Sequence, residues 1–499
     1  MRRAAEIRDA LRQHRATWRL AVGAAAAGLA VAAGAVALAG PWDAGQRSAE
    51  RRQAAADATG DRMDTERIGS TLPAAEPVLV PLEAGEGGAE GAGVPAGLTD
   101  ALGSLLGDPA LGDHVTAAVL DLTTGERLYA EDPGGGRVPA STIKIVTALA
   151  ALDALGPDHR LATTVRWDAD GERVVLVGGG DPTLTEADLA GLARRTAAAL
   201  AERGITGASL AYDVSLYAGG GQRHPLGVND NIALITPLQV NEGRLDGSTS
   251  GPTPRATHPE QDAAELFAAD LAEAGLRVEG RPARHAAPED PEEAEQLAIH
   301  RSAPLGSLVE RMLTNSDNDL AEALGRHTAL AQGRRADFRG VGRAVAQELD
   351  ALGLPHEGVR IADASGLDRE DRLTADLLTR ALVAAGDPDR PELRPVLTGL
   401  PVAGFTGTLA GRFDGDAGAA RDTDPVAGGA AAAPADAGAG AVRAKTGTLT
   451  GVNTLAGTVM TRDGRVLAFA FLASGTADAA AAEAALDAAA GTLAGCACG

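Results

Sequence analysis

The sequence predicts an α+β fold in which a five-stranded antiparallel sheet is flanked by helices and interrupted by a large inserted α/β domain. Strand-like apolar segments gather at two places, between residues 114 and 130 and again between 441 and 473. From about 163 to 299, short strands alternate with helices instead. We therefore expect residues 94–162 and 300–499 to form one domain, with 163–299 inserted into it.

The first 40 residues predict export. Six arginines precede an uncharged stretch from Leu20 to Gly40. A positive segment followed by an apolar run is typical of a secretory signal or a signal anchor, and this run can span a bilayer as a helix. A buried Ala-rich helix is the alternative, and Ala37-Leu38-Ala39 leaves cleavage open. We expect residues 1–40 to be a basic cytoplasmic stub with a signal or anchor helix, and the remainder to be extracytoplasmic, membrane-anchored or secreted.

The next segment, residues 41–93, has no hydrophobic periodicity and predicts a disordered linker. A second stretch, 414–440, consists mostly of Ala, Gly, Asp and Pro and predicts a mobile low-complexity loop. Helices are expected near 98–106, 141–152, 186–203, 260–275, 305–313, 317–331, 337–352, 374–386 and 477–494, and strands near 114–121, 127–130, 174–178, 208–213, 441–447, 453–461 and 465–473.

Composition excludes several classes of function. The formal net charge of −23 argues against nucleic acid as a partner, because phosphate binding needs a basic face. The nine histidines are scattered and form no H-E-x-x-H motif, and the two cysteines, Cys496 and Cys498, are too close for a zinc site. The chain also lacks the G-x-S-x-G motif of Ser-His-Asp hydrolases. We therefore expect neither a metal nor a cofactor.

Lysine is nearly absent from this chain. Lys144 and Lys445 stand beside 43 arginines. Arginine can replace lysine wherever a positive charge suffices, but it stays protonated, whereas a buried lysine can lose its proton and act as a base. The two lysines therefore indicate where the chemistry lies.

The first lysine belongs to an S-x-x-K motif formed by Ser141 and Lys144. If a helix begins at Ser141, residues i and i+3 share a face, and the amine lies beside the hydroxyl. Serine is a weak nucleophile until a base takes its proton, and burial or a second cation lowers the pKa of a lysine. The alternative is a helix-capping serine with a surface lysine, which the scarcity of lysine argues against.

The second motif is S-D-N, with Ser316 and Asn318, between two predicted helices. In the functional interpretation Ser316 relays a proton, and the Asn318 amide holds Lys144 and the substrate backbone. The alternative is a cluster that caps the following helix.

The third motif is K-T-G-T, at the end of a strand-like run. A glycine at 447 lets another backbone approach closely, and a cation with two hydroxyls can bind a substrate carboxylate. The alternative is a lysine on an edge strand. The motif comprises Lys445, Thr446, Gly447 and Thr448.

In this order and on these elements, the three motifs resemble those of the penicillin-recognising serine enzymes, the D,D-peptidases and serine β-lactamases. The separation of 175 residues from Ser141 to Ser316 resembles the D-alanyl-D-alanine carboxypeptidase/endopeptidase family, the class C low-molecular-mass penicillin-binding proteins, which carry a large insertion there. The resemblance covers roughly residues 95–495 and implies a β-lactamase/transpeptidase-like domain. Further stretches that look like that family are 179–182, 363–369, 400–409 and 443–451.

The resemblance implies a serine-type D-alanyl-D-alanine carboxypeptidase or endopeptidase acting on peptidoglycan stem peptides, with β-lactams as inhibitors. Ser141 would attack the carbonyl of the penultimate D-alanine, Lys144 would take its proton, and Ser316 would return a proton to the leaving amine. The backbone N–H groups of Ser141 and Thr448 would form the oxyanion hole.

The same resemblance assigns the terminal carboxylate to Lys445, Thr446 and Thr448. It also suggests Asp230 and Arg369 as residues that face the stem peptide, although both could equally be solvated loop charges. The inserted segment that holds Asp230, residues 227–237, lacks the aromatics that members of the family often carry there.

Two other functions compete with this interpretation. A serine β-lactamase or esterase of the same fold would turn penicillin over rapidly. A wall-binding protein without catalysis would not need three intact motifs.

Overall fold

The computed structural model describes residues 96–287, 294–413 and 435–496, all within one compact unit. The predicted membrane segment, the linker and residues 414–434 of the predicted loop lie outside the described residues, as does Cys498. Within the described ranges, no helix is long and apolar enough to cross a membrane.

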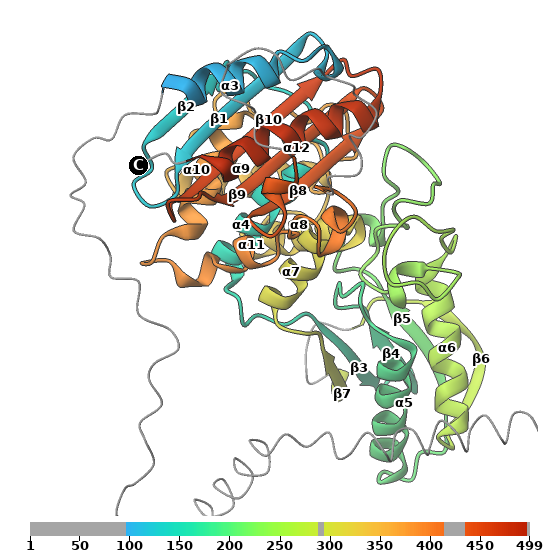
Figure 1. Ribbon diagram of the computed structural model, residues 1–499. Coiled ribbons are helices and arrows are strands. Elements are labelled where there is room, and N and C mark those ends of the chain that lie inside the picture. Colours follow the sequence, from blue (N-terminus) through green and yellow to red (C-terminus); the bar gives the residue numbers. More distant parts are fainter. Residues whose placement is uncertain (1–95, 288–293, 414–434, 497–499) are drawn as a thin grey trace, which may run out of the picture. The chain divides into compact units, whose positions relative to one another are not determined.

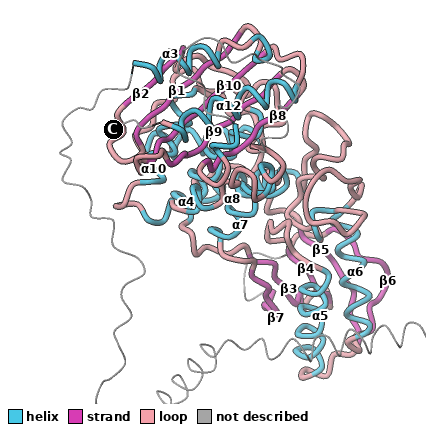
Figure 2. The backbone as a smooth tube through the Cα atoms, viewed as in Figure 1, coloured by secondary structure: helices cyan, strands magenta, loops and turns pink. Residues whose placement is uncertain are grey.

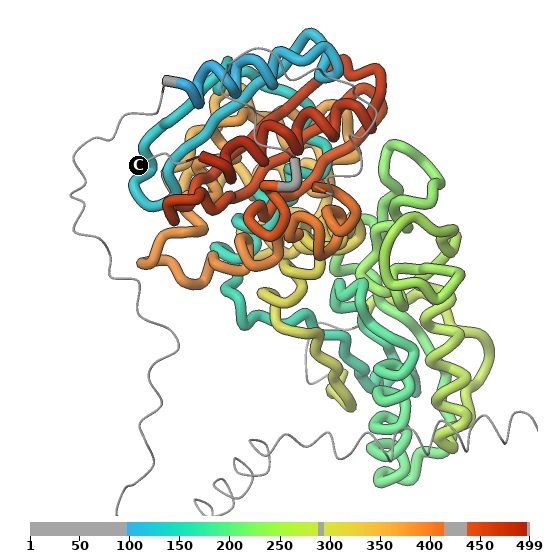
Figure 3. The backbone as a smooth tube through the Cα atoms, viewed as in Figure 1, coloured from blue at the N-terminus to red at the C-terminus, as the bar shows by residue number. Residues whose placement is uncertain are grey.

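A five-stranded antiparallel sheet joins the two ends of the described chain, as the sequence predicted. Its strand order is β2-β1-β10-β9-β8, so strands from the first and last parts of the chain lie side by side (Figure 3). The strands are β1 (His114–Asp121), β2 (Arg127–Glu131), β8 (Val442–Leu449), β9 (Val452–Met460) and β10 (Val466–Ser474).

Helices cover both faces of this sheet (Figure 1). One face packs against α3 (Ala96–Leu106) and α12 (Ala479–Gly495), with Phe469 and Phe471 in that core. The opposite face, which carries the alternate residues Ala468 and Ala470, packs against the other helices. Alternation of side chains along each strand thus fills two separate cores. The helices on the second face are α4 (Ile143–Leu155), α7 (Leu305–Asn315), α8 (Asn318–Ala331), α9 (Phe338–Ala351), α10 (Ala375–Gly386) and α11 (Pro395–Thr398).

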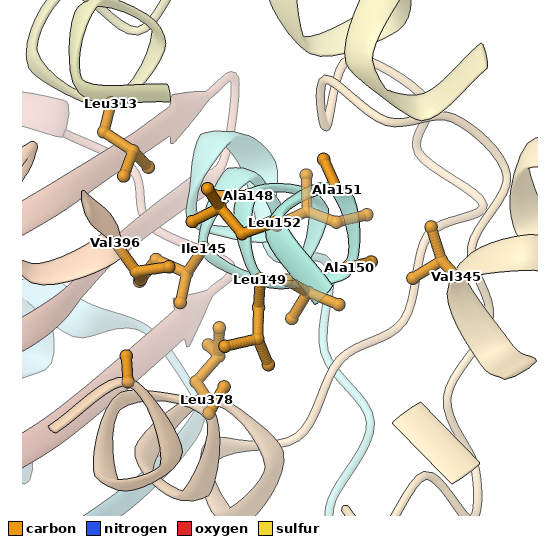
Figure 4. Packing of buried hydrophobic residues seen from close by; sticks show 14 of the residues in the cluster. Ile145, Ala148, Leu149, Ala150, Ala151, Leu152, Leu313, Val345, Leu378 and Val396 are labelled. Carbon is orange, nitrogen blue, oxygen red and sulfur yellow. The ribbon is translucent and has the colours of Figure 1, made fainter. Parts of the chain in front are cut away.

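Helix α4 lies at the centre of the second core. Every residue from Ile143 to Leu152 is buried, and Leu313, Val345, Leu378 and Val396 point toward it from the surrounding helices (Figure 4). A helix that is apolar on all sides is typical of a core position. The prediction that this helix begins at about Ser141 was early by two residues, because residues Ala140–Thr142 form a 3-10 turn first.

The inserted block is an α/β layer with its own core. Its sheet order is β6-β5-β4-β3-β7, in which β4, β5 and β6 are parallel and β3 is antiparallel to β4 and β7. The sequence analysis had placed only β4 and β5 among these strands. The elements are β3 (Ala162–Asp168), β4 (Arg173–Val177), α5 (Glu186–Ala201), β5 (Gly207–Asp213), α6 (Pro259–Glu273), β6 (Arg277–Arg284) and β7 (Ala294–Arg301).

Between β5 and α6, residues 214–258 run as loops and short 3-10 turns (Figure 2). These loops reach the start of α8: the Asn318 side chain donates a hydrogen bond to the Asn231 carbonyl at 3.0 Å, and the Asp319 carboxylate accepts one from the Ala233 N–H at 2.9 Å. The insertion therefore contributes directly to the surroundings of the S-D-N motif.

Candidate active site

Lys144 lies at the centre of the three motifs. Its side chain is fully buried, and its Nζ is 2.9 Å from Ser141 Oγ, 2.7 Å from Asn318 Oδ1 and 2.5 Å from the carbonyl oxygen of Ser365. In the neutral amine, two N–H groups can donate to Asn318 and Ser365 while the lone pair accepts the Ser141 hydroxyl proton. The geometry is that of a serine activated by a lysine base.

The segment before α4 brings Ser141 next to the K-T-G strand. Ala140 has a positive φ of 46°, a backbone strain that is common at functional sites. A Cβ atom at position 447 would lie 2.7 Å from the Pro139 carbonyl oxygen, and one at 366 would lie 1.9 Å from the Ala140 carbonyl oxygen. Glycine is therefore required at both positions for the strand and the 363–368 loop to approach Ser141.

The S-D-N motif forms the turn between α7 and α8. Ser316 ends α7 in the left-handed conformation, with φ 58° and ψ 39°. Asp317 caps α8, since its carboxylate accepts a hydrogen bond from the Leu320 N–H at 3.0 Å. Asn318 is the first residue of α8, which directs its amide to Lys144.

The K-T-G motif lies inside β8, the edge strand of the sheet, and not at a strand end as the sequence suggested. Lys445 is fully buried, and its Nζ donates to the Thr446 carbonyl at 2.9 Å. The hydroxyl of Thr446 donates to that of Thr408 at 2.8 Å, and the Thr448 hydroxyl donates to Glu483 at 3.0 Å. The two threonines, rather than the lysine, face the pocket.

Burial lowers the pKa values of both lysines. It brings the pKa of Lys144 to about 8, although the charges of Asp363 and Asp317 act in the opposite direction. The pKa of Lys445 is lowered well below its usual value by burial and then by the charge of Lys144. A lysine whose pKa is near 8 is suited to serve as a general base near neutral pH.

A pocket of about 400 Å³ opens over Ser141. It brings together Ser141, Ser316, Asn318, Thr446 and Thr448 from the predicted site, while Lys144 and Lys445 lie buried behind them. Its remaining lining residues are Asn231, Arg244, Ser250, Gly251, Pro252, Arg255, Asn315, Asp317, Leu367, Thr408, Arg412 and Glu483.

Asp230 and Arg369 do not belong to this lining set. Asp230 is exposed next to Asn231, which does line the pocket. The Arg369 guanidinium donates to the Thr450 carbonyl at 2.8 Å, just beyond the K-T-G motif. A role for either residue in binding the stem peptide stays a prediction.

Arg412 is a pocket residue that the sequence analysis missed. Its guanidinium forms a two-point ion pair with Asp487, with N–O distances of 3.0 and 2.6 Å, and this pair fixes it beside Thr446 and Thr448 in the pocket wall. Arg412 lies three residues after the end of the 400–409 stretch that resembles the family, so the sequence held a signal for it.

Fold and site together define a serine acyl-transfer enzyme with a Ser–Lys pair, in the class of the penicillin-recognising peptidases. The D-Ala-D-Ala carboxypeptidase 3 (S13) family matches residues 98–249 and 235–495. The chain belongs to this family.

Individual relatives agree with the family match. The chain is 36% identical over 400 residues to a carboxypeptidase of Mycobacterium tuberculosis, covering 76% of this chain and 80% of that one. It is 35% identical over 417 residues to carboxypeptidase DacB of Mycolicibacterium smegmatis, covering 81% and 85%. In fold, it resembles penicillin binding protein 4 of Haemophilus influenzae, with a TM-score of 0.58, 21% identity, and coverage of 78% of this chain and 98% of that one.

Proposed function

We propose that this chain is a penicillin-binding, serine-type D-alanyl-D-alanine carboxypeptidase that acts on peptidoglycan stem peptides. Family membership supplies the reaction class. The observation that carries the chemistry is the buried Lys144 amine, 2.9 Å from the Ser141 hydroxyl and held by Asn318 and Ser365.

In the proposed mechanism, the Ser141 oxygen attacks the carbonyl of the penultimate D-alanine while its proton moves to Lys144. The backbone N–H groups of Ser141 and Thr448 stabilise the oxyanion. Ser316, which lines the same pocket, passes the proton from Lys144 to the leaving amine, and the terminal D-alanine departs. Water then hydrolyses the acyl-enzyme, and a β-lactam stays bound at that stage because its leaving group remains attached.

The terminal carboxylate of the substrate is assigned to the hydroxyls of Thr446 and Thr448, beside Gly447. Lys445 lies behind these hydroxyls: it is fully buried, and its Nζ donates to the Thr446 carbonyl, so it holds the strand that presents the two threonines. Arg412 lines the same pocket, where its guanidinium is held at two points by Asp487. In the free enzyme Thr448 donates to Glu483, so substrate binding requires this hydroxyl to turn.

The function is tested by labelling the purified protein with fluorescent penicillin and assaying release of D-alanine from a D-Ala-D-Ala pentapeptide, beside Ser141→Ala. We expect the wild type to label and to release D-alanine, and the variant to do neither. A wild type that does neither would refute the proposal. Rapid turnover of the penicilloyl-enzyme would instead indicate a β-lactamase, and cleavage of a cross-linked dimer would add endopeptidase activity.

The acylation rate is expected to depend on pH. Because the neutral Lys144 amine is the base and its pKa is about 8, the rate constant for penicillin acylation should rise about tenfold per pH unit below pH 8 and level off above it. Stopped-flow measurement of acylation across this range checks the prediction, with spontaneous penicillin hydrolysis subtracted. A flat profile, or one that falls with pH, would remove Lys144 from the role of base.

We also propose that the enzyme works outside the cytoplasm, anchored by a helix within residues 1–40 or secreted after cleavage. The arginine-rich start and the apolar run of the sequence support this. N-terminal sequencing of the protein from membrane and secreted fractions distinguishes the two forms, and recovery from the cytosol alone would contradict both.

A further inference from the structure

A buried ionic network ties the S-D-N turn to the inserted block. Glu242, in the loops between β5 and α6, contacts the guanidinium of Arg311 on α7, which also lies 3.5 Å from the Asp317 carboxylate. Arg255 donates from the inserted block to Asp319 at 2.8 Å. Together with the contacts of Asn231 and Ala233 described above, these bonds connect the turn to the inserted block.

Glu242 is the centre of this network. Its side chain is completely buried, and its two carboxylate oxygens accept from different arginines: Oε1 from Arg311, and Oε2 from Arg244 at 2.7 Å. Its carbonyl oxygen accepts from Arg255 at 2.7 Å. The backbone here is strained, since both Asn241 and Glu242 have positive φ values, 45° and 56°. Strain of this kind persists only where the surroundings enforce it.

When its three carboxylates are ionised, which for Glu242 requires a pH above its pKa of about 8, the network is balanced in charge. The carboxylates of Glu242, Asp317 and Asp319 lie close enough to one another to hold a metal ion. Three guanidinium groups, those of Arg244, Arg255 and Arg311, already pair with them. Because each carboxylate is paired with a guanidinium group, the cluster does not need a cation to balance its charge. This indicates a structural role, in which the network holds the two segments together.

We propose that Glu242 is a positioning residue that fixes the S-D-N turn through Arg311 and Asp317, and so holds Ser316 and Asn318 at the distances that acylation needs. This inference rests on the proposed function, because Ser316 and Asn318 matter only if Lys144 and Ser141 react. It gives the inserted block a part in catalysis: one of its loops supports the catalytic turn, and Arg244 and Arg255 of the same network line the pocket. Misplacement of a catalytic group by about 1 Å can cost about 100-fold in rate.

Glu242→Gln tests the proposal. An amide accepts with only one of its two heavy atoms, so its NH2 group would face either Arg311 or Arg244. We expect the acylation rate constant at saturating fluorescent penicillin to fall about 10- to 100-fold, with the dissociation constant of the initial complex nearly unchanged. The assay is run at pH 9, because burial and then the charge of Asp317 raise the pKa of Glu242 to about 8.

Asp213→Asn is the matched control. Asp213 is also buried in the inserted block, and its two carboxylate oxygens accept from two different donors, the N–H groups of Ser215 at 2.7 Å and Ala287 at 2.8 Å. The same chemical change is therefore made in the same block without touching the S-D-N turn. We expect it to lower the melting temperature while acylation stays within about twofold of wild type.

A double-mutant cycle with Arg311→Gln separates positioning from general destabilisation. If Glu242 acts through Arg311, the double variant should lose no more acylation than the single variants. The proposal is overturned if Glu242→Gln acylates at the wild-type rate, or if Asp213→Asn slows acylation as much as Glu242→Gln does. It is also overturned if the losses of acylation rate in Glu242→Gln and Arg311→Gln add up in the double variant. A wild type that fails to label would instead refute the proposed function.

Discussion

Replacing Lys144 with arginine is expected to reduce penicillin acylation by about 10²- to 10⁴-fold, the usual contribution of a general base. Arginine keeps its proton at any pH at which the protein is folded, so it has no lone pair to accept the Ser141 proton. The buried amine also donates at once to Asn318 and Ser365, and a planar guanidinium cannot reproduce both contacts from the same atom. Fluorescent-penicillin labelling over time, compared with thermal unfolding, measures the two effects separately.

Lys445→Arg is the matched control, because it makes the same substitution at the other lysine of the chain. The Lys445 amine donates to the Thr446 carbonyl, a contact that an arginine N–H can also make, so acylation should fall by less than about tenfold. Lys445 is as deeply buried as Lys144, and the larger side chain should therefore cost about 1–3 kcal/mol of stability. Retained labelling in Lys144→Arg would remove Lys144 from the role of base. Equal loss in both variants would show that the two lysines do not have different roles.

The sequence predicted the sheet and the catalytic pair because both depend on local patterns. Two lysines in an arginine-rich chain drew attention to Ser141 and Lys144, and one helical turn is enough to bring their side chains together. In the main sheet, strand β10 (Val466–Ser474) is an almost continuous apolar run, and most residues of β1 and β9 are buried. Strand β6, by contrast, reads Arg277–Arg284 with mostly exposed residues, so its pairing with β5 could not be read from hydrophobic periodicity.

The residues that support the site could not be predicted, because their partners are distant in the sequence. Glu242 and Arg311 are 69 residues apart, and nothing in either segment alone indicates their contact. Asp363 appeared in the sequence only as part of a family-like stretch without a role. Its partner His224 lies 139 residues away, in the inserted block. Contacts between residues so far apart depend on the folded structure, and neither hydrophobic periodicity nor a short motif reveals them.

Asp363→Ala is expected to give the largest loss of stability among the substitutions considered. The Asp363 carboxylate is completely buried and accepts hydrogen bonds from the backbone N–H groups of residues 365, 366, 367 and 368, from the Ser365 hydroxyl and from His224 at 2.9 Å. Burial raises its pKa, but the bonds from His224 and from the Gly366 N–H outweigh this and lower the pKa to about 2. The carboxylate is therefore ionised, and its removal leaves several buried donors without an acceptor. Such losses cost about 3–5 kcal/mol.

The same substitution should also abolish acylation in the fraction that stays folded. The loop that Asp363 organises presents the Ser365 carbonyl to Lys144, and Gly366 packs against the Ala140 carbonyl next to Ser141. Loss of the carboxylate therefore releases the Lys144 amine and the nucleophile segment together. Urea unfolding gives the stability change, and labelling at a temperature where the variant is folded gives the catalytic one.

Asp368→Ala makes the same change at the end of the same loop, where the carboxylate accepts one hydrogen bond from the described part of the chain, that of the Glu370 N–H at 2.8 Å. It should cost no more than about 1 kcal/mol and leave labelling intact. If Asp363→Ala were as stable as Asp368→Ala, the hydrogen bonds to Asp363 would not be what holds the loop. If it were unstable but labelled at the wild-type rate when folded, Lys144 would keep its position without Ser365, and Asn318 alone would have to orient the base.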